Sequence, residues 1–279
     1  MCRNNFILLT ASFEKGINDK ETIYKNIERL NDVNGKIKSF DDSIYKEDAI
    51  FSVNFIDNKQ LYEILFSEHI DFKQDYKTML IEIINKAKTL NDENCHYIGL
   101  NHVDTPDNII YTISNLMQSY YDAIENISSE EEFFICVKKY FQNLVFHDNV
   151  KTSLPTLKGA GLKCFSKDII STLKTLENNF QDILQKNHQD VRKSLLELST
   201  IIGLETTIEG NIDRKPDFTF NFKQHNGSDI SICCEPHVKL CRSSIEGDST
   251  YYFNRLHFHV GNPNVGNGKI LIGSIGYHL

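Results

Sequence analysis

The sequence contains no run of apolar residues that approaches the roughly 18 needed by a membrane-spanning helix. Its first apolar run, Phe6–Leu9, is too short for the hydrophobic region of a secretory signal peptide, and no convincing cleavage site follows. This run is more typical of an early β-strand. We therefore expect a protein without a membrane segment that is located in the cytoplasm.

Paired cysteine motifs are also lacking. The seven cysteines are odd in number, and no two of them are separated by two residues. Neither a disulfide framework nor a zinc site built from CxxC pairs is therefore indicated. Free thiols suit a reducing compartment, which agrees with the cytoplasmic location expected from the N-terminus.

Positive charge is scarce for a protein that would bind nucleic acid over a broad surface. The formal net charge is −8, and residues 1–202 hold 30 acidic against 23 basic residues. Residues 203–279 are nearly neutral, with eight acidic against seven basic residues, and contain five of the ten histidines. This charge argues against broad electrostatic attraction to nucleic acid or to anionic membrane. The C-terminal part can still hold a local cationic site.

Apolar residues recur at helical spacing in the middle of the chain, between residues 60 and 203. The serines at 128 and 129, followed by Glu131 and Glu132, indicate a capped helix start, and Gly203 indicates a helix end. The apolar stripes themselves are expected to form core. The spacing predicts helices over residues 72–87, 110–124, 128–144, 166–183 and 191–202.

From residue 204 the pattern becomes that of β-structure. Residues 218–222 alternate between phenylalanine and polar residues, and Asn226-Gly227 is a strong hairpin signal. Together with a short strand at 51–55, we expect an α+β fold. A mainly helical region with short N-terminal strands would span residues 1–203, and an antiparallel β-meander would span residues 204–279. Its further strands are expected over residues 229–240, 250–260 and 269–275.

The strands expected at 229–240 and 250–260 have one apolar and one polar face. Successive side chains of a strand point to opposite faces, and in both segments the even positions are mostly apolar. If the strands are neighbours, the odd positions form one polar patch. Pro236 lacks an N–H and implies an edge or a bulge. A plain solvent-facing surface is the alternative interpretation. The odd positions hold Glu235, His237, Lys239, Tyr251, Phe253, Arg255, His257 and His259.

This set of side chains matches what cleavage of a phosphodiester bond needs without a cofactor: a base, an acid and cations for the charge on phosphorus. Glu235 and His237, with His257, would transfer protons. Lys239 and Arg255 would hold the phosphate. The aromatic rings and the remaining imidazole would bind a base of single-stranded RNA. These substrate-binding side chains are Tyr251, Phe253 and His259.

Residues 235–240, 252–258 and 270–279 resemble the ending of uncharacterised bacterial proteins found among phage-defence and toxin genes. In outline the predicted sheet is also similar to that of RelE- and barnase-like ribonucleases, in which catalytic groups line one sheet face, although no residue motif connects them. The resemblance implies a toxin- or defence-type nuclease with RNA as its expected substrate. It also implies a protein partner, for which the acidic helical region is a candidate docking surface.

A metal-dependent nuclease is the first alternative. Pro216-Asp217, placed at the start of a strand, and the segment from Glu235 to Lys239 partly resemble the PD-(D/E)xK nucleases. The resemblance implies that Asp217 and Glu235 bind Mg²⁺, which would activate water. Histidine stands where that family has its lysine, and a hairpin follows where it has a helix, so the match is incomplete.

Three further alternatives stay open. His257 and His259, with His237 or Glu235, could form a metal-binding module. Cys233 lies on the same face as the histidines and could pair with one of them as a nucleophile. Finally, the protein could be a non-enzymatic sensor or adaptor subunit of a multi-protein defence complex, with the polar face contacting a partner.

Overall fold

The computed structural model describes residues 4–14, 19–89, 96–104, 106, 108–208, 210–240 and 253–277. Its contacts divide the chain into an N-terminal unit, Met1–Tyr120, and a C-terminal unit, Tyr121–Leu279. The sequence suggested a division after residue 203 instead. The difference arises because residues 144–146 form a strand of the same sheet as residues 270–277, so the helices after residue 120 share a core with the C-terminal strands.

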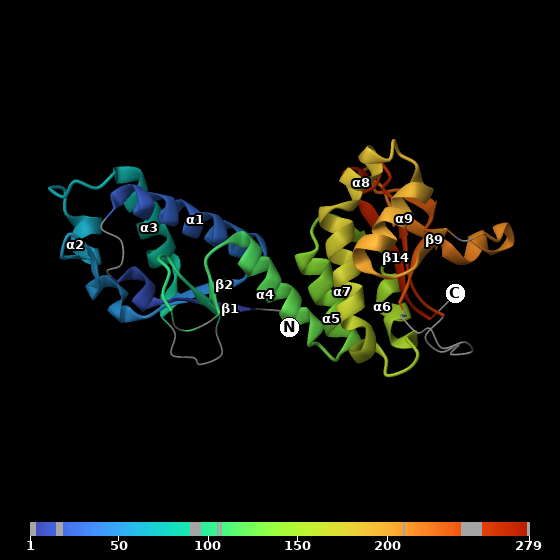
Figure 1. The fold of residues 1–279 in the computed structure, drawn as a ribbon, viewed down its shortest axis with the longest axis horizontal. Coiled ribbons are helices and arrows are strands. Elements are labelled where there is room, and N and C mark those ends of the chain that lie inside the picture. Colours follow the sequence, from blue (N-terminus) through green and yellow to red (C-terminus); the bar gives the residue numbers. More distant parts are fainter. Residues whose placement is uncertain are drawn as a thin grey trace. The chain divides into compact units, whose positions relative to one another are not determined.

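The N-terminal unit contains a five-stranded sheet in the order β5-β2-β1-β6-β7. Its neighbouring strands β1 and β2 are labelled in Figure 1. Every pairing in this sheet is parallel. Counted along the chain, the strand order is 3-2-1-4-5, which is that of open doubly wound α/β sheets. The strands are β1 Asn5–Leu8, β2 Ser43–Lys46, β5 Lys88–Thr89, β6 His96–Ile98 and β7 Ile109–Ile110.

The central strand β1 explains why this sheet is covered on both faces. Phe6, Ile7 and Leu8 point to alternate faces, and none is more than 7% exposed. Strands buried on both sides are apolar throughout, as in other parallel sheets. The early strand predicted from the sequence is therefore confirmed. Its place at the centre of a parallel sheet was not predicted.

Helices and short segments connect these strands. The expected strand at residues 51–55 is only partly formed, because its first two residues belong to a 3-10 helix and its last two to β3. The elements are η1 Thr10–Phe13, α1 Lys20–Ser39, η2 Asp48–Ser52, β3 Asn54–Ile56, β4 Lys59–Gln60, α2 Leu61–Phe66, α3 Gln74–Lys86 and α4 Ile113–Glu125.

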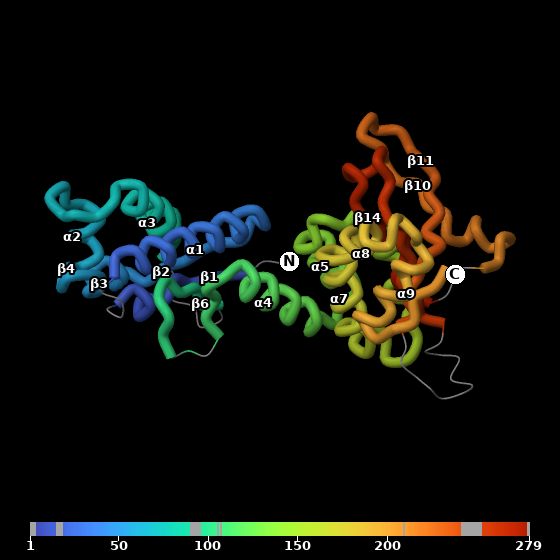
Figure 2. The backbone as a smooth tube through the Cα atoms, turned by 45° about the horizontal axis from the view of Figure 1, so that its top comes forward, coloured from blue at the N-terminus to red at the C-terminus, as the bar shows by residue number. Residues whose placement is uncertain are grey.

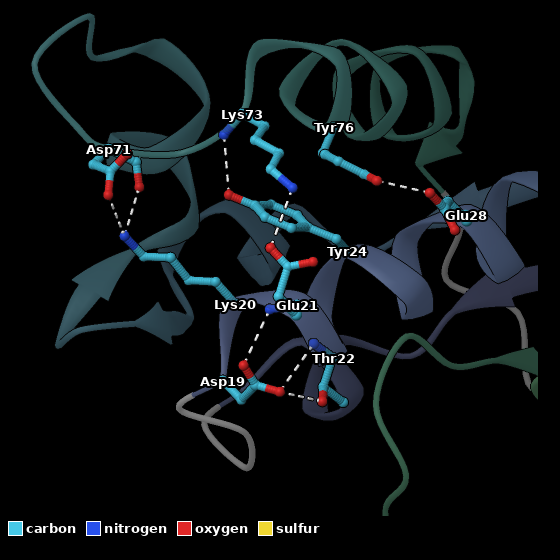
Figure 3. A network of polar contacts seen from close by, with 9 residues as sticks. All are labelled: Asp19, Lys20, Glu21, Thr22, Tyr24, Glu28, Asp71, Lys73 and Tyr76. Atoms are coloured by element: carbon cyan, nitrogen blue, oxygen red, sulfur yellow. Dashed lines mark hydrogen bonds and ion pairs between the residues drawn. The ribbon is translucent and has the colours of Figure 1, made fainter.

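Ion pairs and hydrogen bonds join α1 to α3 and to the loop before it (Figure 3). Lys20 Nζ lies 2.9 Å from Asp71 Oδ2, and the Tyr76 hydroxyl donates to Glu28 Oε1 at 2.7 Å. This bond to a carboxylate raises the pKa of Tyr76 to about 12, because a phenolate beside it would be repelled. These contacts fix the start of α1 against α3.

The C-terminal unit contains a mixed five-stranded sheet in the order β8-β14-β13-β12-β9. β9, β12, β13 and β14 pair antiparallel, which confirms an α+β fold with antiparallel strands at the C-terminus, and β8 joins β14 in parallel. The strands are β8 Leu144–Phe146, β9 Thr206–Ile208, β12 Pro236–Lys239, β13 Asn254–His259 and β14 Ile270–Tyr277.

A separate hairpin, β10 (Thr219–Lys223) with β11 (Asp229–Cys233), packs against this sheet (Figure 2). The turn predicted at Asn226-Gly227 is confirmed within its loop. The single strand expected over 229–240 is wrong, because the chain leaves the hairpin after Cys233 and starts β12 at Pro236. Proline lacks the N–H that a continuous ladder would need at this point.

Helices cover one face of the mixed sheet, and the hairpin with the 3-10 helix η4 (Ile212–Phe218) covers the other. On the helical face, Phe258 meets Phe180 of α8 edge to face at 5.6 Å between ring centres. On the hairpin face, an apolar cluster joins β10 and β11 to β14. Its members are Phe220, Phe222, Ile232, Cys234, Val265 and Leu271.

The helices predicted between residues 72 and 202 are formed with corrected ends, and the one expected over 166–183 is divided into α7 and α8. Leu144 lies on β8 and Ile110 on β7, so two expected helices are shorter than their apolar stripes. Ser166 lies inside α7, whereas Ser129 does cap α5, accepting from Glu132 N at 3.3 Å. Gly203 ends α9 with a φ of 69°. The elements are α5 Glu130–Tyr140, α6 Asn149–Ser153, η3 Leu154–Thr156, α7 Leu162–Asn178, α8 Phe180–Lys186, α9 Val191–Ile202 and η5 Gly266–Gly268.

Two general expectations can also be compared with the structure. In the described part of the chain, no helix combines the length and apolar character needed to cross a membrane. Cys136 is disulfide-bonded, which corrects the expectation that the cysteines carry free thiols, while Cys164, Cys233 and Cys234 are free.

Candidate functional site

The antiparallel pairing of β12 with β13 brings most of the predicted site residues onto one sheet face. His237 lies opposite His257, and Lys239 opposite Arg255. The row through the two histidines continues to Thr207 on β9 and to Ser274 on β14. The prediction that odd-numbered side chains share a face holds for His237, Lys239, Arg255 and His257.

This face is covered, however, and its centre is closed to solvent. His237 is 6% exposed, His257 1% and Arg255 5%. The ring of Phe218, at the end of η4, stacks on the ring of His257 at 4.6 Å and 15°. The guanidinium of Arg214 lies over the Phe218 ring, 5.4 Å from its centre. The expectation of an open polar patch is therefore wrong, because η4 folds back over the strands.

Hydrogen bonds fix the two buried imidazoles to the backbone. Nδ1 of His237 lies 3.1 Å from the carbonyl oxygen of Glu235, and Nδ1 of His257 lies 3.2 Å from that of Cys234. Because a carbonyl only accepts, both Nδ1 atoms donate. Nε2 of neutral His237 then accepts from the Thr207 hydroxyl at 3.1 Å. The two histidines hold consecutive carbonyls at the break between β11 and β12, where the chain passes from the hairpin into the sheet.

Glu235 follows this break and lies at the edge of the covered face. Its carboxylate is 3.2 Å from Nζ of Lys215, and about a quarter of its side chain (23%) is exposed. The backbone of Lys215 is held in turn, since its carbonyl accepts from the hydroxyl of Thr219 at 2.8 Å and from the thiol of Cys233 at 3.7 Å. An ion pair of this kind can open to admit a substrate, in contrast to the sealed histidines.

A cavity of about 460 Å³ opens beside Glu235. It is large enough for one nucleotide unit or another small ligand. His259 reaches it from β13, so two of the side chains singled out in the sequence meet here. The cavity is lined by Cys233, Glu235, His259 and Asn262 and by the apolar side chains of Val191 and Ile208.

His259 has a defined proton position in this cavity. The backbone N–H of Gly261 donates to its Nδ1 at 3.1 Å, so the neutral ring carries its proton on Nε2. Burial lowers the pKa of His259 below its ordinary value, because the charged ring would lose water. Near neutral pH this histidine is therefore an uncharged hydrogen-bond donor.

The predicted phosphate-binding pair lies at the opposite end of β12 and β13. Lys239 forms an ion pair with Glu205, and Arg255 is buried with Nη1 donating to the carbonyl of Asn254 at 3.1 Å. Four residues separate positions 235 and 239, which is about 13 Å along a strand. Lys239 and Arg255 therefore do not meet Glu235 and His259, which corrects the idea of one continuous site.

The aromatic residues expected to bind a base do not gather at the cavity either. Phe253 is half-buried at the Lys239 end, 6.1 Å from the ring of Tyr277. Tyr251 lies outside the described residues. Stacking of a base by this pair stays a prediction without support from the described part of the site.

The alternative metal ligands face cations instead of each other. Asp217 lies in η4 and not at the start of a strand, and its carboxylate is 3.4 Å from Nε of Arg214. Glu235 pairs with Lys215. Among the described residues, no group of three or more His, Cys, Asp or Glu side chains is arranged to hold a metal ion. The placement of Asp217 in a helical turn is the main departure from the PD-(D/E)xK pattern.

Two residues that matter here were not singled out in the sequence. Lys215 precedes Glu235 by 20 positions, in a segment without strand or helix periodicity, and only the folding of η4 brings the two together. Thr207 pairs with His237 across β9 and β12. Its strand has three residues, which is too short for a reliable alternation signal. Cys233 donates to the backbone carbonyl of Lys215, and among the described residues no hydrogen bond joins it to an imidazole.

Comparison of the chain with protein-family models, with curated protein sequences and with solved structures found no match. Arguments about function therefore rest on the site itself.

Proposed function

We propose that the cavity beside Glu235 is the active site of a phosphodiester-cleaving enzyme that acts on RNA. The observation that carries this proposal is that Glu235, which forms an ion pair with Lys215, and His259 line the same cavity. These groups supply a base, a cation and a neutral donor, which are the components that such a reaction needs.

RNA is favoured because its own 2′-hydroxyl can act as the nucleophile. In the proposed reaction Glu235 takes the proton of the 2′-hydroxyl while its oxygen forms a bond to the adjacent phosphorus. The P–O5′ bond breaks, and the leaving oxygen takes a proton from the ammonium group of Lys215. His259 Nε2 donates to a non-bridging oxygen, where negative charge develops. The products are a 2′,3′-cyclic phosphate and a free 5′-hydroxyl.

The buried histidines have a positioning role in this proposal. His237 and His257 hold the carbonyls of residues 235 and 234, so they fix the backbone from which the Glu235 carboxylate extends. Both are removed from solvent, which argues against direct proton transfer to a substrate. This role replaces the acid–base role that the sequence suggested for them.

The test is incubation of the purified protein with labelled RNA and DNA, with and without EDTA. Glu235→Gln should reduce the cleavage rate by about 100-fold or more, as loss of a general base does. The matched control is Glu205→Gln, which removes a carboxylate paired with a lysine at the other end of β12. It should leave the rate within about twofold, since it lies about 13 Å away.

Three results would contradict the proposal. The wild-type protein could fail to cut either nucleic acid, the two glutamine variants could lose equal activity, or cleavage could require Mg²⁺. The last result would favour the alternative in which Glu235 and Asp217 bind the metal. Cutting of RNA in EDTA with 5′-hydroxyl products supports the reaction as written.

A partner-binding role is a second candidate, supported by exposed apolar side chains near the edge strand β9. Leu196 and Ile201 of α9 are 69% and 53% exposed, and Ile212 after β9 is 72% exposed. Exposed apolar groups of this size often mark protein contacts. We propose this surface, in place of the broad acidic region, as the docking site of an adaptor. Co-purification of a subunit that is lost in Leu196→Asp, without nuclease activity, would favour it.

A further inference from the structure

The carboxyl edge of the parallel sheet carries a second group of polar side chains, in the N-terminal unit. β1 and β6 are neighbours, but the chain continues from β1 to β2 on one side and from β6 to β7 on the other. Open α/β sheets bind ligands at such a reversal, beyond the carboxyl ends of the strands. The segments that leave these two strands, residues 9–13 and 99–103, are therefore the place where a ligand would lie.

Buried hydrogen bonds hold these two segments together. The N–H of Leu100 donates to Ser12 Oγ at 3.0 Å, and the N–H of Asn101 donates to Ser12 O at 3.1 Å. Ser12 is fully buried. Asn26 of α1 adds a bond from its Nδ2 to Asn101 Oδ1 at 3.0 Å. The edge is thus fixed before any ligand arrives, as expected of a preformed site.

Arg29 of α1 reaches this edge, and no described residue provides a counter-ion for it. Its Nη2 donates to the carbonyl of Leu100 at 2.8 Å, and the guanidinium lies 5.6 Å from the centre of the Tyr111 ring. Among the described residues, Nε of Arg29 has no hydrogen-bond partner and no carboxylate forms an ion pair with it. Loss of water around the half-buried cation lowers the pKa of Arg29. A charge that has lost water without gaining an opposite charge is unfavourable, and an anionic ligand would relieve this.

Thr10 contributes a second polar atom that the described chain leaves unused. It is the second residue after β1, and its Oγ1 is buried with no hydrogen-bond partner in the described part of the protein. Thr10 and Ser12 lie in the same turn, and Ser12 bonds to Leu100, whose carbonyl binds Arg29. The hydroxyl and the guanidinium therefore flank the same pair of segments.

The helix terminus that holds a pyrophosphate in many doubly wound folds is closed in this protein. The carboxylate of Asp19 caps α1 by accepting from the N–H groups of Glu21 and Thr22, each at 3.2 Å (Figure 3). Glu21 adds a second negative charge in the first turn. Residues 9–20 also contain a single glycine, so the GxGxxG pattern of dinucleotide sites is absent. A negative group of a ligand is therefore directed to Arg29 and not to the start of α1.

From these contacts we infer that the edge between β1 and β6 binds a small metabolite through a phosphate or carboxylate group. This group pairs with the half-buried guanidinium of Arg29 and supplies a counter-ion that the described residues do not. Small side-chain movements let it also accept hydrogen bonds from Arg29 Nε and Thr10 Oγ1, both of which are closed to solvent. The site lies in the N-terminal unit and does not depend on the proposed reaction at Glu235.

The test uses the full chain and measures calorimetric binding and thermal unfolding with AMP, inorganic phosphate and succinate in separate experiments. Arg29→Gln should weaken binding by about tenfold or more, which corresponds to 1.4 kcal/mol. It should not lower the unfolding temperature without ligand, because it removes an unpaired charge. The matched control is Lys25→Gln, an exposed cation on the same helix, which should leave affinity within about twofold.

The probes separate the possible sources of the anion. Binding of AMP well above that of phosphate identifies a nucleotide, and binding of succinate alone identifies a carboxylate. The inference is overturned if none of the probes binds the wild-type protein with a Kd below about 1 mM, or if Arg29→Gln and Lys25→Gln bind equally. Should Arg29→Gln fail to fold, Thr10→Val takes its place, and unchanged affinity in that variant overturns the inference.

Discussion

The two five-stranded sheets of this protein place their polar residues in different positions. In the parallel sheet the central strand β1 is apolar along Phe6–Leu8, and buried polar side chains follow the strand ends, as Ser12 and Asn101 do after β1 and β6. In the mixed sheet the polar side chains lie within the strands, as His237 and His257 do, and are buried under η4. A buried polar group needs a hydrogen-bond partner. The mixed sheet can meet this need in mid-strand because the break between β11 and β12 leaves two carbonyls free of the ladder.

This difference changes how polar alternation in a strand should be interpreted. Alternation identified the shared face of β12 and β13 correctly, but a polar face is not necessarily a solvent face. The functional groups proposed for both units, Glu235 and Arg29, lie at the margins of buried polar networks instead of at their centres. In each unit the buried network fixes backbone, and a charged side chain at its margin remains available to a ligand.

Replacing Phe218 tests this comparison most strongly. Its ring covers the buried histidines of the mixed sheet, and no such row of buried polar side chains occurs within the described strands of the parallel sheet. Phe218 is fully buried and stacks on His257. Phe218→Ala should lower the free energy of unfolding of the C-terminal unit by about 3–5 kcal/mol, from lost burial and a residual cavity. Urea unfolding followed by circular dichroism measures this, and hydrogen exchange of the β12 and β13 amides locates it.

Ile212→Ala is the control for this change, since Ile212 belongs to the same 3-10 helix but is 72% exposed. It should alter stability by no more than about 0.5 kcal/mol. A loss below about 1 kcal/mol in Phe218→Ala would mean that η4 does not seal the row, and direct roles for His237 and His257 would then regain support.

The fold was predictable where periodic patterns were long. The stripes of α3, α5 and α9 and the hairpin turn at Asn226-Gly227 gave elements close to those observed. α1 was missed although its buried residues also recur every three or four positions. The segment is mostly polar, and asparagines and Gly35 interrupt its apolar stripe. The parallel sheet was missed because its strands have two to four residues, too few for a pattern, and its outer strand Lys88–Thr89 is exposed.

The candidate site was predictable only along single strands. The spacing of His237, Lys239, Arg255 and His257 indicated a common face, and their pairing follows from it. Burial of that face depends on η4 folding back over β12 and β13, and the Lys215–Glu235 pair depends on the same event. No local sequence pattern predicts the contact of η4 with these strands, because it joins segments about 20 residues apart through a connection of irregular structure.

Two glycines, one in each unit, extend the comparison to backbone packing. A Cβ on Gly273, at the β-bulge of β14, would lie 2.5 Å from the Phe220 ring and 3.0 Å from Cys234 Sγ. A Cβ on Gly99 would lie 2.4 Å from the Tyr111 ring and 2.8 Å from Ile109 Cγ2, but the Tyr111 ring is partly exposed and can shift outward. Gly273→Ala should therefore cost about 1–3 kcal/mol of stability, and Gly99→Ala less.

Thermal and urea unfolding of both variants measure this difference. Gly210→Ala is the control, because no atom lies within 4 Å of the added Cβ. A larger loss of stability in Gly99→Ala than in Gly273→Ala would contradict this expectation. It would show that the edge of the parallel sheet is packed more rigidly than the hairpin face of the mixed sheet.

The smallest expected effect concerns pH, and each sheet supplies one histidine for it. Burial lowers the pKa of His96 on β6 and of His259 on β13 below the ordinary histidine pKa of about 6.5, so both are harder to protonate in the folded chain than in the unfolded chain. Below pH 6.5 the unfolded chain binds more protons at these positions than the folded chain does. Stability therefore falls as the pH decreases from about 6.5 toward the lower folded pKa values, and it is unaffected by these groups above that range.

Replacing one histidine at a time assigns this loss to a unit. His96→Gln and His259→Gln should each reduce the decrease in stability between pH 7.5 and pH 5.5. If the proposed reaction is also measured, only His259→Gln should change the rate at pH 7.5, because only that ring reaches the cavity beside Glu235. An equal effect of His96→Gln on the rate would mean that the cavity is not where the chemistry occurs.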